Sequence, residues 1–415
     1  MNLSFKILAS ACLLTAVAAC SSDKATEPTQ EQPDINSNWE LTTQLDLTSD
    51  EKENIDIVND FSHKLMTEAQ ATSENGMFCV SPLSISVYLG MLANSTTGDV
   101  HDEIMAALGT NDINTLNSLN KKLMHYLPCD NNGSSIAVAN RFWVNHAFNV
   151  PETFCSLVSD VFNAEVDYVD FTDKTTVPAI NKWVSDKTDG KIPSLLDGDW
   201  EKYIALTMVS ANTVYFKGNW QSMFDPEESS IESFYGLTGD SKARMMHNTL
   251  SAGYAKNSIV QIVTLDFEGA NNTMELYLPA EGIDIRDITS TLSAEACTEL
   301  RKSIQPYDVT LSLPSFENSA ETDLPKILES MGIKSLDKAD FAPMGLGNIP
   351  TKLLHKTSIR IDEKGAELAA VTGGMDILMP DKSDYPKVKV DFDRSFLYIV
   401  RNNKTGAILM AGTVM

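Results

Sequence analysis

Positive charge is scarce in this sequence. Its 415 residues include 32 Lys and Arg against 57 Asp and Glu, which gives a formal net charge of -25 at pH 7. Nucleic acids, heparin-like polyanions and anionic lipid surfaces attract proteins through clusters of Lys and Arg. The composition therefore argues against a nucleic-acid partner, a heparin-like cofactor and electrostatic docking on lipid.

Motifs for catalysis and for metal binding are missing as well. The chain has no G-x-S-x-G, no H-E-x-x-H and no P-loop. Its six cysteines show no C-x-x-C or Cys/His spacing of the kind that binds zinc. We therefore expect a protein that is not an enzyme and that uses no cofactor and no metal.

The few cysteines give limited information about redox state. Cys79 lies in the apolar run of residues 77–80, where a buried free thiol is more common than a disulfide. Export from the cytoplasm would permit disulfides, so the states of Cys129, Cys155 and Cys297 stay open.

The N-terminus carries features of an export signal. The apolar residues 7–19 follow Lys6 and are too few to span a bilayer as a helix. They end in Val-Ala-Ala followed by Cys20, which resembles the lipobox of bacterial lipoproteins, where the cysteine carries the lipid. An ordinary secretory signal with an incidental cysteine is the alternative.

The residues after Cys20 support an anchor. Residues 20–45 are rich in Ser, Thr, Glu, Gln and Pro, a composition that cannot bury a core. We expect residues 1–19 to be a lipoprotein signal peptide and residues 20–45 to be a flexible tether. The protein would be lipid-anchored in the cell envelope, at the outer membrane or the cell surface, with shedding into the extracellular space as an alternative.

Residues 46–415 are expected to form one domain. The hydrophobic content of 43% suffices for a large core, and no Pro/Gly-rich linker, repeat or further membrane span interrupts the sequence. Helical spacing dominates early, for example over residues 50–70 and 81–94, and strand-like runs dominate late, for example over residues 273–278 and 396–401. This segregation predicts an α+β domain. Gly218 is expected in a turn that requires an unusual backbone angle.

One segment has the chemistry of a strand that could enter a sheet. An alternating run over residues 359–362 leads into small residues, and no proline occurs between Gly365 and Met379. Ala366, Leu368, Ala370 and Thr372 share one face of the extended chain, whereas Glu367, Ala369 and Val371 share the other. About 14 extended residues would span roughly 45 Å. The alternative is an ordinary exposed linker, which the composition of residues 373–384 would also suit.

Seven separated stretches resemble the serpin family, in the family's order. They are residues 78–91 (with Ser-Pro-Leu-Ser at 81–84), 139–143 (Ala-Asn-Arg-Phe-Trp), 180–192, 212–226 (beginning Asn-Thr-Val-Tyr-Phe-Lys-Gly), 309–316, 354–372 and 392–415. The resemblance implies an α+β serpin fold with about nine helices on three mainly antiparallel or mixed β-sheets. It also implies an exposed reactive-centre loop over about residues 363–391.

The resemblance assigns roles to particular residues. The hinge of the reactive-centre loop would comprise Glu363, Gly365, Ala366, Glu367, Leu368, Ala369, Ala370, Val371 and Thr372. Ser81, Ser84, Asn212 and His355 would form the shutter, a buried polar cluster beneath the central sheet. A neutral His can donate from one ring nitrogen and accept on the other, so His355 could link an amide and a hydroxyl and latch the sheet. Trp220 would lie in the core at the breach, where the sheet opens.

Counting as the family does places the scissile bond between Met379 and Pro380. Most serine proteases cleave poorly before proline, so cleavage between Leu378 and Met379 is an alternative, and Lys382 is a further one for a trypsin-like target. Leu368 also departs from the family, which prefers a small residue there. A buried Leu368 could slow insertion and turn the loop into a substrate.

The function implied is suicide inhibition. A target serine protease, or as a second option a cysteine protease, would form an acyl-enzyme that loop insertion then traps. Apolar Leu378 and Met379 point to elastase-, chymotrypsin- or subtilisin-like targets. The protein is expected to be a monomer. The alternative is a non-inhibitory serpin that serves as a membrane-anchored binding or scaffold protein.

Overall fold

The computed structural model describes most of the predicted domain. The described residues are 42, 44–73, 75–128, 134–322, 324–349, 351–366 and 384–415. The chain divides into two units, Met1–Asp34 and Ile35–Met415, and all described residues belong to the second. Within them, no helix combines the length and the apolar character needed to cross a membrane.

Nine α-helices occur in the described part of the chain. They are α1 (Ser49–Thr72), α2 (Pro82–Ser95), α3 (Asp99–Ala107), α4 (Ile113–Tyr126), α5 (Glu152–Phe162), α6 (Thr176–Lys187), α7 (Ile285–Thr291), α8 (Ala294–Lys302) and α9 (Leu324–Ser330). The start of α1 is fixed by a capping box: Thr48 Oγ1 accepts from Glu51 N at 3.2 Å, and Glu51 Oε2 accepts from Thr48 N at 2.8 Å. In α2, Ser81 is the N-cap and Pro82 takes the first helical position.

Fifteen strands make two sheets in this described part. They are β1 (Cys79–Val80), β2 (Ser134–Asn145), β3 (Ala164–Val169), β4 (Met208–Asn219), β5 (Ser230–Gly236), β6 (Gly239–Lys256), β7 (Val260–Asp266), β8 (Asn272–Pro279), β9 (Gln305–Pro314), β10 (Phe316–Thr322), β11 (Thr351–Asp362), β12 (Gly365–Ala366), β13 (Lys387–Asp391), β14 (Phe396–Asn402) and β15 (Ile408–Val414). The nine-stranded sheet has the order β1-β15-β14-β8-β7-β6-β9-β13, with β5 paired to β6. The six-stranded sheet has the order β10-β11-β12-β4-β2-β3.

The expectation of three sheets is corrected to two for the described residues. The cause is β6, which at 18 residues is long enough to serve two groups of partners. Its residues 253–256 pair with β7, whereas residues 239–245 pair with β5 and residues 245–254 with β9. The backbone pairing along β6 therefore joins into one sheet two groups of strands that the resemblance would place in separate sheets.

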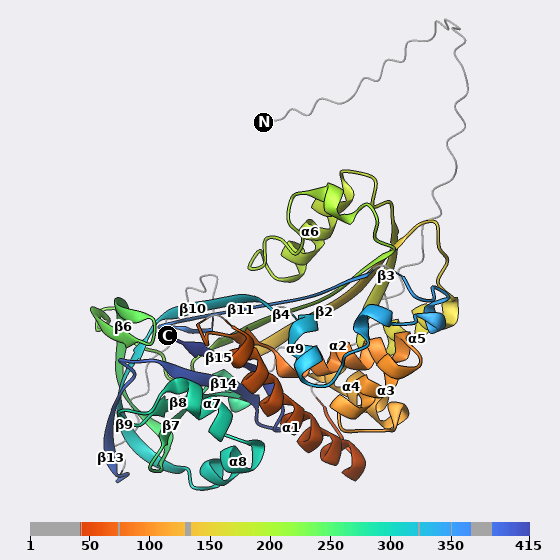
Figure 1. Cartoon of the computed structure of the whole chain (residues 1–415). Coiled ribbons are helices and arrows are strands. Elements are labelled where there is room, and N and C mark those ends of the chain that lie inside the picture. The colour runs from red at the N-terminus through yellow and green to blue at the C-terminus, as the bar shows by residue number, and fades with distance from the viewer. Residues whose placement is uncertain are drawn as a thin grey trace, which may run out of the picture. The chain divides into compact units, whose positions relative to one another are not determined.

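The helices cover the six-stranded sheet from both sides (Figure 1). Helix α6 lies on one face, where Val184 packs with Trp143 and Leu354 of the sheet. On the other face, α2 brings Leu89 and Leu92 into a core shared with α1, α3, α4 and α5. A further core, with Val214, Phe216 and Leu278 among its members, joins residues of both sheets. The α+β class is confirmed.

Two local expectations have different outcomes. Gly218 lies inside β4 and not in a turn, so that expectation is wrong. A Cβ at this position would come within 2.9 Å of the Phe267 ring and of Ser134 Cβ, so the glycine is required by close packing.

Cys79 is a buried free thiol, as predicted.

Candidate functional site

Two neighbouring strands of the six-stranded sheet separate near one end. β11 and β4 are parallel and pair from Thr351 with Met208 to Ser358 with Tyr215. Beyond these pairs, residues 361–362 of β11 and residues 218–219 of β4 each pair with β12. β12 therefore occupies the space between the two strands, and it is antiparallel to both.

β12 is formed by Gly365 and Ala366, two residues near the start of the predicted reactive-centre loop. In the structure they are already paired within the sheet. Gly365 has a backbone φ of +145°, a value that residues with a Cβ rarely adopt. A Cβ there would lie 2.1 Å from Gly218 O and 2.8 Å from Trp220 N. Ala366 is completely buried, as expected of a small residue on the face that enters the core. The space between β11 and β4 is thus too narrow for a side chain at position 365, and it encloses the small side chain of Ala366 completely.

Trp220 fastens the turn that precedes β12. Its backbone N–H donates to Lys364 O at 2.7 Å, and its indole Nε1–H donates to Asp362 O at 3.0 Å. The ring is buried and stacks on Phe267, with centroids 4.7 Å apart and planes within 10°. The breach position that the resemblance assigned to Trp220 is therefore in direct contact with the hinge.

Glu363 is held by its side chain as well. Its Oε1 accepts from Arg244 Nε at 2.6 Å and from Ser229 Oγ at 2.9 Å. Burial alone would raise the pKa of this carboxyl, but the Arg244 guanidinium and the other donors outweigh it, and the pKa is lowered. The charged form of Glu363 therefore ties the start of the loop to β6.

Three of the four predicted shutter residues meet at Asn212. Its Oδ1 accepts from Ser84 Oγ at 2.7 Å and lies 2.7 Å from His355 Nδ1. Its Nδ2 donates to Asn140 Oδ1 at 2.8 Å, and Asn140 Nδ2 donates to Phe162 O at 3.0 Å. The network connects β11, β4, β2 and helices α2 and α5. Asn212 is its centre, whereas the sequence placed His355 in that role.

The contact with an amide oxygen fixes the tautomer of His355. Nδ1 faces an acceptor, so it carries the proton, and Nε2 is left as a bare acceptor. Nε2 is buried and has no hydrogen-bond partner in the described chain. Burial lowers the pKa of His355 from 6.5 to about 3, which keeps the ring neutral.

Ser81 has a different part in the structure. Its Oγ donates to Leu409 O at 2.6 Å and accepts from Ser84 N at 3.3 Å. It thus caps α2 and ties this helix to β15, next to the network, and its own bonds go to Leu409 and Ser84.

Several predicted site residues lie outside the described residues. They are Glu367, Leu368, Ala369, Ala370, Val371, Thr372, Leu378, Met379, Pro380 and the lipidation site Cys20. At the far end of the predicted loop, the described chain resumes at Asp384 and enters β13 at Lys387.

The structure adds site residues to which the sequence gave no role. Asn140 belongs to the Ala-Asn-Arg-Phe-Trp stretch, so it was noticed without being linked to Asn212. Arg244 lies 119 positions before Glu363, and no local pattern indicates that the two form an ion pair. Such pairs follow from tertiary packing alone.

The hydrogen-bond network around Asn212 lacks the arrangement of a catalytic nucleophile. Ser84 Oγ bonds to an amide oxygen, so it lacks the adjacent base that activates a nucleophile. The described residues also contain no group of three or more His, Cys, Asp or Glu that could hold a metal ion. What the arrangement offers is a buried, hydrogen-bonded polar layer across strands that must separate if the sheet is to open.

Comparison with known proteins agrees with this geometry. The family model described as "Serpin (serine protease inhibitor)" matches residues 56–415. Human neuroserpin is 30% identical over 380 residues, which cover 86% of this chain and 90% of neuroserpin.

Solved structures show the same fold. The native state of tengpin, a thermophilic serpin, has a TM-score of 0.77 and 26% identity, and covers 90% of this chain and 97% of its own. Thyroxine-binding globulin in complex with thyroxine has a TM-score of 0.76 and 25% identity, and covers 87% and 98%. With a family model over most of its length and a relative at this identity, the chain belongs to the serpin family.

Proposed function

We propose that this protein is a suicide inhibitor of serine proteases. The observation that carries the proposal is β12: the first residues of the loop already pair with β11 on one side and β4 on the other. A cleaved loop could continue this pairing along the sheet. Insertion would exchange the parallel pairing of β11 with β4 over residues 351–358 for two antiparallel ladders.

The reaction uses the protease's own groups. The target's serine attacks the carbonyl carbon of the specificity residue, the peptide bond breaks, and the new amine leaves with the C-terminal segment. The loop remains attached to the protease as an ester. If insertion precedes attack by water, the protease is carried with the loop and its active site is distorted. The inhibitor supplies strand-forming residues and no catalytic group.

The loop sequence suggests the class of target. We assign the reactive bond to Met379–Pro380, with Leu378–Met379 as the alternative. Both place an apolar side chain in the specificity pocket, which suits elastase-, chymotrypsin- or subtilisin-like proteases. Cleavage after Lys382 would indicate a trypsin-like target.

The proposal includes attachment to a membrane. Cleavage before Cys20 and lipidation of its thiol would leave residues 20–45 as a tether for the inhibitory domain. The domain would then act at the outer membrane or cell surface. The net charge of -25 supports a mode of action without a heparin-like cofactor.

A non-inhibitory role is the second candidate. Leu368 would be buried on insertion, and Pro380 follows the assigned bond. One structural relative, thyroxine-binding globulin, was solved in complex with thyroxine, so the fold also serves for ligand binding. Under this alternative the protein would be a membrane-anchored binding or scaffold protein, and its loop would be cut without trapping the protease.

One experiment separates the two candidates. A soluble form that begins at Ser21 is incubated briefly with elastase, chymotrypsin, subtilisin and trypsin, each alone. Suicide inhibition predicts a covalent complex that survives denaturing electrophoresis. The released C-terminal peptide, weighed by mass spectrometry, should begin at Pro380, or at Met379 or Ser383 for the alternative bonds. Cleavage by these proteases without any complex would favour the non-inhibitory role.

A further inference from the structure

A cavity of about 480 Å³ lies where the end of α1, helix α7 and the turn between β5 and β6 meet. Its walls include Gln70 of α1, Leu237 of the turn and Arg286 of α7. The volume is in the range of cavities that bind small molecules. None of its described lining residues belongs to β4, β11 or β12, so the cavity is separate from the strands that loop insertion would rearrange.

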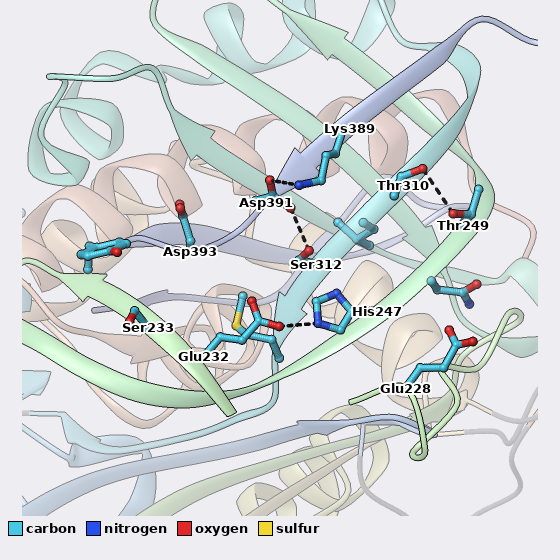
Figure 2. A pocket seen from close by; sticks show the side chains of 14 residues that line it. Glu228, Glu232, Ser233, His247, Thr249, Thr310, Ser312, Lys389, Asp391 and Asp393 are labelled. Atoms are coloured by element: carbon cyan, nitrogen blue, oxygen red, sulfur yellow. Dashed lines mark hydrogen bonds and ion pairs between the residues drawn. The ribbon is translucent and has the colours of Figure 1, made fainter. Parts of the chain in front are cut away.

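The described lining of this cavity contains no carboxylate. In contrast, the cavity built where the strands β5, β6, β9 and β13 meet has four, from Glu228, Glu232, Asp391 and Asp393 (Figure 2). The cavity beside α7 is lined by one cation, Arg286, and otherwise by neutral residues. In a chain with a net charge of -25, it is therefore a place where an anion meets a cation and no wall of like charge.

Gln70 points to a ligand. Its side chain is only 6% exposed, and its Nε2 has no hydrogen-bond partner within the described chain. A buried amide donor without a partner is costly and rare in folded proteins. Gln70 lines the cavity, and rotation about the last side-chain torsion of Gln meets broad, shallow minima. Its amide can thus turn toward an acceptor that enters the cavity.

Arg286 supplies a second donor, which is charged. Its Nε donates to Asp284 Oδ1 at 3.0 Å and its Nη2 to Asp284 Oδ2 at 2.5 Å, whereas Nη1 has no partner among the described residues. A Cβ added at Gly76 would lie 3.2 Å from Arg286 Cγ, so the stem of Arg286 rests against the backbone there. Asp284 and Gly76 hold the guanidinium in place and leave one side of its fork open to an acceptor.

The remaining walls set the shape of the occupant. Leu237 is 39% exposed and offers an apolar surface, and the Met415 methyl group lies 3.4 Å from the position of a Cβ at Gly76. The end of α1 does not present a bare carbonyl of Gln70, because Gln70 O accepts from Ser73 N at 3.3 Å and from Ser73 Oγ at 3.0 Å. Two donors beside an apolar wall suit an anion with an apolar body.

We propose that this cavity binds a small amphiphilic carboxylate. The carboxylate accepts from Gln70 Nε2 and from Arg286 Nη1, and the apolar body lies against Leu237. The site goes beyond the proposed function and does not depend on it, because its walls lie outside β4, β11 and β12.

The test is isothermal titration calorimetry of the soluble form with decanoate, below the concentration at which decanoate forms micelles. Decyltrimethylammonium, which has the same alkyl chain and the opposite charge, is titrated in parallel. The variants are Gln70→Met, which keeps the length of the side chain but removes the donor, and Arg286→Gln. The matched control is Lys64→Gln, which removes an exposed cation from α1 outside the lining.

We expect wild type and Lys64→Gln to bind one decanoate with equal affinity and to leave decyltrimethylammonium unbound. Gln70→Met and Arg286→Gln should each weaken the binding of decanoate about tenfold or more. Gln70→Met should also raise the melting temperature of the free protein, because the unpaired buried donor is gone.

Three results would overturn the site: no binding of decanoate to wild type, equal affinity of wild type and both variants, or equally tight binding of decyltrimethylammonium. A failure to trap proteases would overturn suicide inhibition and leave these titrations unchanged, so the two proposals fail separately.

Discussion

At the residue scale, His355 makes the native state sensitive to acid. Its unfolded imidazole binds a proton with a pKa near 6.5, whereas the buried ring does so only near 3. Between these values the unfolded state binds more protons, so stability increases with pH across the window. The contribution of His355 is complete above about pH 6.5 and is lost as the pH falls toward 3.

We therefore expect His355→Gln to flatten the pH profile of unfolding. Between pH 7 and pH 4.5, wild type should lose about 2 kcal/mol more stability than the variant. Urea unfolding at both pH values measures this. His63, with a pKa lowered to about 4, acts in the same direction but is present in both proteins and cancels in the difference. Equal losses for the two proteins would contradict the assignment of His355.

Asn212 is the residue on which the network depends. Asn212→Ala removes the acceptor of Ser84 and His355 and the donor to Asn140, and it leaves these groups buried without partners. We expect a loss of about 2–5 kcal/mol in the free energy of unfolding, since each unpaired buried group costs about 1–3 kcal/mol.

A second Asn→Ala variant, outside the network, is the control for Asn212→Ala. Asn114→Ala changes an exposed asparagine near the start of α4 and should shift stability by less than about 0.5 kcal/mol. A similar small shift for Asn212→Ala would show that the network does not hold the sheet.

At the scale of elements, β12 is a short strand whose entry depends on one glycine. The turn of Glu363 and Lys364 is fastened by Trp220 and Phe224, and Gly365 then passes against Gly218 O. The sequence predicted a hinge with small residues here, and it predicted helices over 50–70 and 81–94 that the structure has as α1 and α2. It did not predict that residues 365–366 of the loop already form a strand of the sheet.

Gly365→Ala should expel β12 from the sheet. The added Cβ has no room, and the hydrogen bonds from Trp220 to Lys364 and Asp362 would be lost with the strand. We expect the tryptophan emission to shift to the red and quenching by acrylamide to increase.

Gly198→Ala is the matched control for this prediction, because a Cβ there meets nothing within 4 Å. Its emission and quenching should equal those of wild type. If Gly365→Ala also leaves the spectrum unchanged, β12 is not held as described.

Other elements show what local patterns miss. α4 has a capping Asp112 and buried Leu116, Leu119 and Leu123 at helical spacing, so a closer search for periodicity could have found it. β6 could not be recognised as the link between two groups of strands. Its partners β5, β7 and β9 are set by backbone register, which one strand's sequence does not contain.

At the scale of the whole molecule, the proposal requires a native state that is less stable than the cleaved one. Insertion of about 14 residues would form new hydrogen bonds to β11 and β4 and bury the face with Leu368 and Ala370. Nicking the loop should then raise the melting temperature by at least about 20 °C. Differential scanning calorimetry of the protein before and after limited proteolysis measures this. An unchanged melting temperature with an intact fold would favour the non-inhibitory role.

Leu368→Thr tests the main departure of this loop from its family. A smaller side chain on the inserting face should speed insertion relative to hydrolysis of the ester, so the ratio of covalent complex to cleaved protein should increase about threefold or more. Quantitative denaturing gels give this ratio. Glu367→Gln, on the opposite face, is the control that should leave it near the wild-type value. A ratio that Leu368→Thr does not change would remove Leu368 as a brake on insertion.

The sequence by itself determined what depends on neighbours along the chain: the capped helix α1, the N-cap of α2, the alternation and small residues of the hinge, and the scarcity of positive charge. These features follow from local spacing and composition. The tertiary structure decided what depends on residues far apart: Asn212 as the centre of the polar network, Arg244 on Glu363, the position of Gly365 against Gly218, and a cavity built from four strands. Register and packing bring these groups together, and both arise only when the whole chain folds.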